Sequence, residues 1–203
     1  MNTPRVIFTL VFAAVFCAVM PLSAAAQVGI PSAIDIGLEM ENFEYNEPGV
    51  MSEDGAQYGI YGAYTGYFMQ NIMAHAFLSY VGGDLDYDGG LQFADGSSIA
   101  TTATTPNTIF NFRLAAGYRI PMGGADITPY VGYGYRNLEN EITDELTIKA
   151  TGETGTAPCA GYQRDQKYSY IPLGVQLVFG TTWGIEAVGE YDFFLSGENH
   201  SYR

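Results

Sequence analysis

The stretch Thr108–Ile120, "TIFNFRLAAGYRI", decides the fold. Large apolar side chains occupy every second position, and polar or small residues occupy the positions between them. The apolar set is Phe110, Phe112, Leu114, Ala116, Tyr118 and Ile120, and the other set is Asn111, Arg113, Ala115, Gly117 and Arg119. Because side chains alternate between the two faces of a strand, this pattern predicts a β-strand with one apolar and one polar face.

The same alternation recurs on both sides of this stretch. It is clear at residues 34–40, 127–135, 171–179 and 183–195, and weaker at residues 57–69 and 73–83. The phase of the first segment reverses near Asn42, which predicts a β-bulge that places Phe43 and Tyr45 in the apolar set. Together these segments predict seven strands in one domain.

The N-terminus has the layout of a secretory signal. One positive charge at Arg5 precedes an apolar core at residues 6–20, and Ala24–Ala26 supply the small residues of a cleavage site. We therefore expect a signal peptide at residues 1–26 and a mature domain at residues 27–203. The apolar core is too short to serve as a retained transmembrane helix.

Composition narrows the functional class. The formal net charge of −14 disfavours binding to nucleic acid, which depends on Lys and Arg. Charged residues make up 15% of the chain, against about 25% in ordinary soluble domains. No apolar run after the leader is long enough for a transmembrane helix. An exported chain of this kind points to β-structure in contact with lipid.

The connections between the predicted strands alternate between long and short. The long ones are expected at residues 46–56, 88–107 and 140–166, and they hold most of the acidic side chains. Outer-membrane barrels show this asymmetry between extracellular loops and periplasmic turns. A soluble barrel such as a lipocalin is the alternative. It is disfavoured because the polar face here carries mostly Gly, Thr, Ser, Asn and Tyr instead of Lys and Glu.

One hairpin carries a family resemblance. "YNEPGVMSEDG", through Tyr45, Glu47, Pro48, Gly49, Met51, Ser52, Glu53 and Gly55, resembles the porin-like outer-membrane β-barrel proteins of Gram-negative bacteria. The resemblance implies an all-β, antiparallel, up-and-down transmembrane barrel in the outer membrane, with about eight strands when complete. It also implies a final strand with an aromatic end, from which Arg203 departs. With seven strands counted, we expect the natural C-terminal part to be missing.

The polar face supplies the first candidate site. If it lines the lumen, acids from the first and last strands meet bases from the middle of the chain. The predicted cluster is Asp35, Glu39, Glu41, Arg113, Arg119, Arg136, Glu186, Glu190 and Asp192. Two interpretations stay open: an interior plugged by ion pairs, or a narrow polar pathway that favours cations.

A calcium site is the second candidate. "DLDYDGGLQFAD", residues 84–95, matches the spacing of a twelve-residue calcium loop, with Asp84, Asp86, Asp88 and Asp95 as ligands for a weakly bound Ca²⁺. The alternative is a solvated strand end, since these Asp residues alternate with Leu85 and Tyr87. No other cofactor is expected.

The sequence does not favour an enzyme. His75 and Ser79 share one strand face, but they lie about 13 Å apart along an extended strand, too far for a nucleophile and its base. We expect a non-enzymatic structural or porin-like protein of the cell envelope, with outer-membrane lipid as its surroundings. The alternative is a surface-interaction protein that binds an extracellular partner through its long acidic loops, above all residues 140–166, which include Cys159.

Overall fold

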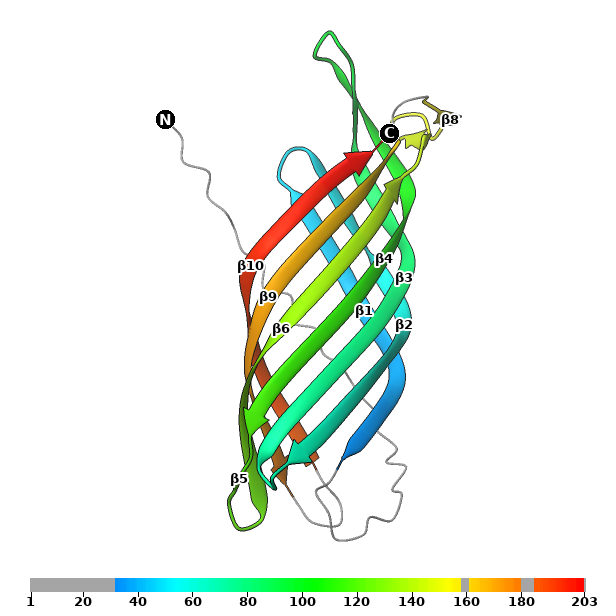
Figure 1. The fold of residues 1–203 in the computed structure, drawn as a ribbon. Helices are drawn as coiled ribbons and strands as arrows, with labels where there is room; N and C mark the ends of the chain where they lie inside the picture. The colour runs from blue at the N-terminus through cyan, green and yellow to red at the C-terminus, as the bar shows by residue number, and fades with distance from the viewer. Residues whose placement is uncertain (1–31, 158–160, 180–184, 203) are drawn as a thin grey trace.

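The computed structural model describes residues 32–157, 161–179 and 185–202 (Figure 1). Seven long strands dominate it: β1 (Ala33–Glu47), β2 (Met51–Phe68), β3 (Ile72–Gln92), β4 (Ser98–Tyr118), β6 (Ala125–Ile142), β9 (Tyr162–Phe179) and β10 (Ile185–Tyr202). Three short strands complete the set: β5 (Ile120–Pro121), β7 (Glu145–Ile148) and β8 (Thr154–Thr156). The described chain thus has ten strands, more than the eight expected.

The long strands form one antiparallel meander, which confirms the predicted fold class. Their order in the sheet is β1-β2-β3-β4-β6-β9-β10, so neighbours in space are neighbours in sequence. The sheet curls into a barrel-shaped wall (Figure 1) around an interior that we call the lumen. Within the described residues β1 and β10 are not paired with each other. The expected signal peptide lies outside these residues.

A band of outward-facing apolar side chains surrounds one part of the wall. It comprises the outward residues of Ile34–Met40, Tyr58–Phe68, Ile72–Tyr80, Phe110–Tyr118, Ile127–Tyr135, Ile171–Phe179 and Ile185–Leu195. Leu38, for example, is 84% exposed. Tilted strands need about 9–11 residues to cross a bilayer. This region is named the membrane band, and it matches the apolar faces predicted from the sequence.

Beyond the membrane band the same strands continue as an outer wall, at the end of the barrel that holds the β1–β2 and β3–β4 turns. Here the polarity of the two faces is inverted. Val81, Ile109 and Leu138 form a buried cluster on the inner face, with Phe43 packed against it. The outer face of β3 carries three exposed aspartates, Asp84, Asp86 and Asp88. The outer wall therefore resembles a soluble barrel, with apolar side chains inside and charges outside.

This inversion corrects the prediction of a bulge in the first strand. The register of β1 with β2 runs unbroken through Asn42, which is opposite Ala56. Phe43 therefore keeps the inward face of Glu39 and Glu41. Its apolar side chain faces inward because the lumen itself becomes apolar at this level. A register shift does occur in β10, between Phe194 and Ser196.

Two of the three predicted long loops are largely strand. Residues 46–56 form a hairpin in which Glu47 is opposite Met51, and residues 88–107 form another in which Gln92 is opposite Ser98. Residues 140–166 do contain a long connection, but it carries the β7–β8 hairpin, and β7 pairs with β4. Cys159 lies outside the described residues. No helix in the described part of the chain is long and apolar enough to cross a membrane.

Candidate functional site

Ion pairs cross the lumen within the membrane band. Arg136 on β6 forms a salt bridge with Glu41 on β1, although three strands separate β6 from β1 in the sheet. Their side chains must therefore reach across the interior. The Glu41 side chain is 15% exposed, so the pair is mostly shielded from water. This contact joins two of the predicted cluster residues.

A second crossing involves β4 and β10. Nη1 of Arg113 lies 2.7 Å from Oε1 of Glu190, and the Tyr130 hydroxyl donates to Oε2 of the same carboxylate over 2.7 Å. The Arg113 guanidinium also lies over the Phe77 ring, 5.5 Å from its centroid. The carboxylate has two donors and the guanidinium has an ion-pair partner and a ring, which offset part of the free energy lost by removing these charges from water, although Nε of Arg113 has no hydrogen-bond partner.

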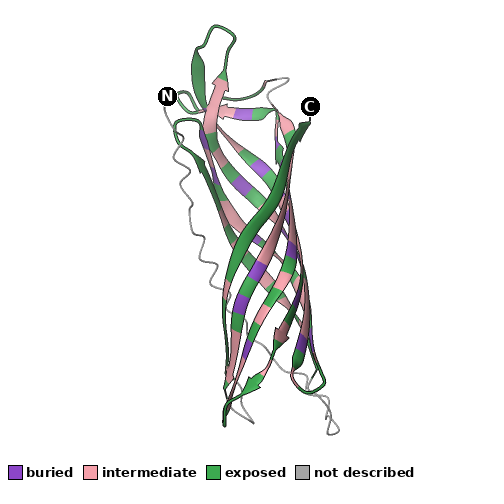
Figure 2. Ribbon diagram, turned by 60° about the vertical axis from the view of Figure 1, so that its left-hand side comes forward, coloured by how far each residue is buried: buried purple, intermediate pink, exposed green. Residues whose placement is uncertain are grey.

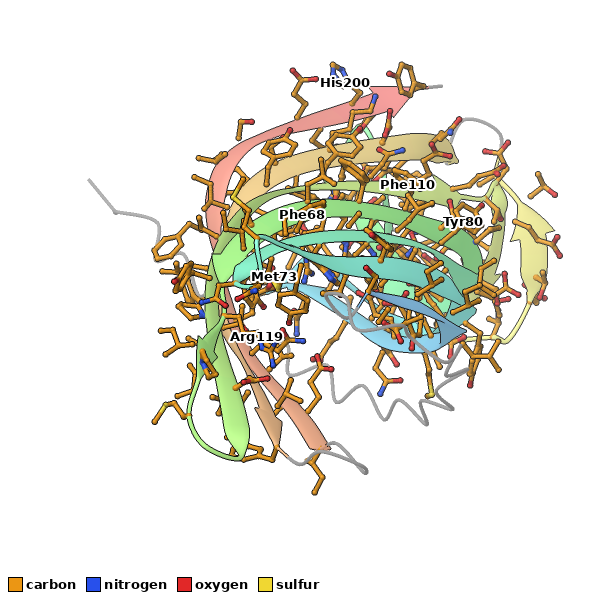
Figure 3. All side chains as sticks on the ribbon, turned by 60° about the horizontal axis from the view of Figure 1, so that its bottom comes forward. Phe68, Met73, Tyr80, Phe110, Arg119 and His200 are labelled. Carbon is orange, nitrogen blue, oxygen red and sulfur yellow. The ribbon has the colours of Figure 1, made fainter. Side chains whose placement is uncertain are left out.

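The inner end of the barrel holds a local ion pair and one contact across the lumen. Arg119, labelled in Figure 3, donates to Asp126 over 2.8 and 2.5 Å, and its guanidinium lies 5.7 Å from the Tyr67 ring centroid. The Tyr67 hydroxyl in turn donates to Gln176 on β9 over 3.4 Å. The sequence analysis missed Asp126. Asp126 lies two residues before Thr128, on the same strand face as Thr128 and Tyr130. Extending this polar set towards the N-terminus would therefore have found it.

A third layer closes the lumen in the outer wall, above the buried Val81 cluster. Glu53 on β2 is only 2% exposed, and its carboxylate lies 4.0 Å from Arg164 on β9. Burial raises the pKa of Glu53, and the more distant Arg164 charge offsets this only in part. Neither residue was predicted, because both lay in segments taken for loops.

Other members of the predicted cluster are not in ion pairs with described cations. These are Asp35, Glu39, Glu186 and Asp192, all from the two edge strands β1 and β10. Glu186 accepts a hydrogen bond from Gln176 over 2.7 Å. The edge strands thus carry more lumen-facing acid than the described bases neutralise.

His75 and Ser79 each have another partner. Nδ1 of His75 lies 3.0 Å from the Thr65 hydroxyl on the neighbouring strand, and Ser79 accepts from Asn111 over 3.1 Å. A void of about 150 Å³ in the inner lumen is lined in part by His75 and Arg113.

The backbone of a twelve-residue calcium loop is not formed, because such a loop requires a tight turn at Gly89, whereas β3 runs through this residue as a regular strand paired with β4. Weak binding of Ca²⁺ by Asp84, Asp86, Asp88 and Asp95 stays a prediction. Asp88 pairs with Lys149 over 2.5 Å, and Asp95 accepts two bonds from Ser97 in the hairpin turn, which lower the pKa of Asp95. Within the described residues no group of three or more His, Cys, Asp or Glu is arranged to hold a metal ion.

The aspartates instead line a groove on the outer wall. The groove has a volume of about 590 Å³ and lies between β2–β4 and the β7–β8 hairpin. Four carboxylates line it, together with the hydroxyls of Ser and Thr residues. The acidic residues are Asp54, Asp86, Asp88 and Glu145. Asp54 and Asp86 are opposite one another in the sheet, so their like charges oppose each other.

Comparison with known proteins agrees with the architecture. A family model described as "Outer membrane protein beta-barrel domain" matches residues 10–199. Searches of curated proteins and of solved structures found no match. The match covers nearly the whole chain, the apolar band faces outward, and the polar side chains face a lumen. The chain belongs to the outer-membrane β-barrel domain family and is a protein of the outer membrane.

Proposed function

We propose that this protein is a structural barrel of the cell envelope that neither conducts solutes nor catalyses a reaction. The observation that carries the proposal is the series of contacts across the lumen. From the inner to the outer end these are Tyr67–Gln176, Arg113–Glu190, Glu41–Arg136, the Val81 cluster and Glu53–Arg164.

The four polar contacts join strands that are not neighbours in the sheet, so each of them obstructs the lumen. In the Val81 cluster, Val81, Ile109 and Leu138 lie on the adjacent strands β3, β4 and β6, and Phe43 on β1 packs against them. An eight-stranded barrel has an interior just wide enough for side chains to fill. The apolar Val81 cluster adds a layer that offers no hydrogen bonds to a hydrated ion. A porin-like pathway would require all of these layers to open together.

Planar-bilayer recording tests this proposal. The parent protein should give no stepwise conductance. A variant that truncates every layer, with Tyr67→Ala, Glu190→Ala, Glu41→Ala, Val81→Ala, Ile109→Ala and Glu53→Ala together, should show current if it inserts, because no layer then crosses the lumen. Leu114→Ala, on the lipid-facing side, should stay silent. Reproducible channels from the parent protein would replace the structural proposal with the porin-like one.

The acidic groove favours a second candidate function, binding of an extracellular partner. Its carboxylates and hydroxyls suit a cationic ligand, such as a Lys-rich peptide, because a negative concave surface concentrates positive charge. The candidate surface combines the outer wall with the β7–β8 hairpin, and it includes Ser52 and Asp54 of residues 46–56 and Asp88 and Thr102 of residues 88–107.

Binding of a labelled oligolysine peptide would test the second candidate. The variant Asp54→Asn, Asp86→Asn and Glu145→Gln should weaken binding at least tenfold. The control variant Glu139→Gln and Glu141→Gln removes charge from a different part of the outer wall, on β6, and should bind like the parent. Equal loss in both variants would show attraction to net charge alone, and no loss in either would exclude the groove.

A further inference from the structure

A group of buried polar side chains lies on the inner face of the outer wall, next to the Val81 cluster. Figure 2 shows buried segments, in purple, on the strands at this end of the barrel. Asn107 and Asn140 each lie two residues beyond an apolar member of the cluster, on the same strand face, and they are opposite one another in the sheet.

Gln57 reaches this pair of asparagines from β2. Its amide nitrogen donates to the Asn107 carbonyl oxygen over 3.2 Å, across the intervening strand β3. Gly83, which is opposite Asn107 on β3, leaves room for the contact, because a Cβ there would lie only 3.2 Å from Cα of Gln57. Side chains from β2, β4 and β6 are thus close together.

Glu53 is the charged member of the group. Burial raises its pKa, and Arg164, Asn140 and Thr105 lie close enough to the carboxylate to offset this rise only in part. Arg164 is 4.0 Å from Oε2 of Glu53, and its Nη2 donates to the Tyr162 hydroxyl. A carboxylate that is removed from water needs a close positive charge. The Glu53 carboxylate therefore has a charge that the described residues compensate incompletely.

Four oxygen atoms of the group accept no hydrogen bond from the described residues. They are Oε1 of Glu53, Oε1 of Gln57, Oδ1 of Asn107 and Oδ1 of Asn140. Each of these side chains is 2% exposed or less. The amide nitrogens of both asparagines are unpaired as well, so either amide can turn its oxygen to a ligand without breaking a described hydrogen bond. Buried polar atoms in proteins nearly always have a partner, so four unpaired oxygens in one group indicate a ligand.

The composition of the group indicates the class of ligand. A carboxylate and three amide oxygens are ligands that a hard metal cation prefers, and none of the four side chains is a thiolate or an imidazole, which softer metals prefer. Such a cation also brings a positive charge to Glu53. Water could pair with the oxygens, but it would leave the carboxylate charge uncompensated.

We propose that Glu53, Gln57, Asn107 and Asn140 bind one hard metal cation through their oxygen atoms, inside the outer wall. Ca²⁺ and Na⁺ both belong to this class. The site is separate from the acidic groove and from Asp84, Asp86 and Asp88, which lie on the outward face. β2 is not a neighbour of β4 or β6 in the sheet, so the ion links strands that no backbone hydrogen bond joins.

Thermal unfolding of the whole 203-residue chain in detergent micelles tests the site. The protein is freed of metal with a chelator, transferred to a choline chloride buffer and titrated with CaCl₂, NaCl or MgCl₂ at constant ionic strength. A ligand that binds the folded state raises the melting temperature with its concentration. CaCl₂ or NaCl should give a saturable rise. MgCl₂ should bind at least tenfold more weakly than the better of the two, because Mg²⁺ demands an octahedral site and loses its water reluctantly.

Variants of the same size locate the ion. Glu53→Gln removes the charge and should weaken binding at least tenfold. Asn140→Asp adds a second carboxylate and should strengthen Ca²⁺ binding at least tenfold, an effect opposite to that of general damage to the fold. The control variant Asp84→Asn, Asp86→Asn, Asp88→Asn and Asp95→Asn removes the weak Ca²⁺ binding predicted on the outward face and should keep the saturable rise. A heat-modifiability gel checks that each variant folds.

Three results would overturn the proposal. A melting temperature that none of the salts changes would show that no cation binds. An equal saturable rise in the parent and in Glu53→Gln would place the ion away from this group. Loss of the rise in the control variant alone would assign it to the outward aspartates. A rise with CaCl₂ only, or with NaCl only, would support the site and identify the charge of its ion.

Discussion

A lysine placed at the centre of the membrane band should destabilise the barrel far more than one placed on the outer wall. Leu114 lies midway along the outward face of Phe110–Tyr118 on β4 and is 48% exposed. Each end of this segment is about 14 Å away along the strand, or about 10 Å in depth for a strand tilted by about 40°. Leu114→Lys should therefore cost about 2–4 kcal/mol, the range for a lysine near the bilayer midplane.

Thr104 provides the matched control on the same strand and face. It lies about 34 Å further along β4 and is opposite Asp86 in the sheet. Thr104→Lys should change stability by no more than about 0.5 kcal/mol, and the sign should be favourable because the new ammonium faces a carboxylate. Urea unfolding from lipid vesicles, followed by the fluorescence of the single tryptophan, measures both. Equal losses in the two variants would refute the assignment of the membrane band.

Four further predictions concern the lumen and the turns. Ile109→Ala should cost about 2–5 kcal/mol in the same urea assay because it leaves a cavity in the fully buried cluster; a loss below about 1 kcal/mol would mean that this layer is not packed. Gly59→Ala should abolish folding into micelles on a heat-modifiability gel, since a Cβ there would lie 1.9 Å from the Tyr80 carbonyl oxygen; a normal gel shift would contradict this close approach. Gln70→Gly should raise stability by about 0.5–1 kcal/mol because Gln70 has a φ of 72° in the β2–β3 turn; a decrease would show that the turn is not strained. Since the pKa of Glu53 is raised in the fold, its contribution to stability is present below the ordinary value of 4.5 and is lost as pH rises through the raised pKa. Above pH 4.5 the melting temperature should therefore fall less steeply with pH in Glu53→Gln than in the parent. An unchanged slope would mean that other groups cause the pH dependence.

The sequence was informative wherever the environment differs between the two faces of a strand. Thr108–Ile120 shows this clearly, because lipid contacts Phe112 and Leu114 while Asn111 and Arg113 face the polar lumen. Lipid and lumen impose opposite chemistries on alternate residues. The alternation therefore predicted the strand, and the burial of the polar set shows which face is inside.

The outer wall was not predictable by the same signal. Beyond the membrane band, water lies outside, and the lumen is lined partly by polar residues such as Gln57, Asn107 and Asn140, each almost fully buried. Both faces then carry polar residues, and alternation disappears although the strand continues. This is why residues 88–107 were interpreted as a loop. The side chains that pair across the lumen come from strands that are not neighbours, and they meet because the sheet curves. The spacing of residues along one strand gives no information about that curvature.

Site-directed spin labelling along β4 tests the central claim most directly. Labels placed one at a time from Thr101 to Tyr118, in the protein reconstituted in vesicles, report access to oxygen dissolved in lipid and to a nickel chelate dissolved in water. We predict high oxygen access at every second position from Phe110 to Tyr118, low access to both reagents at Asn111, Arg113 and Ala115, and nickel access at Thr102 and Thr104. Oxygen access at Arg113 with none at Leu114, or an absence of alternation across the band, would contradict the account.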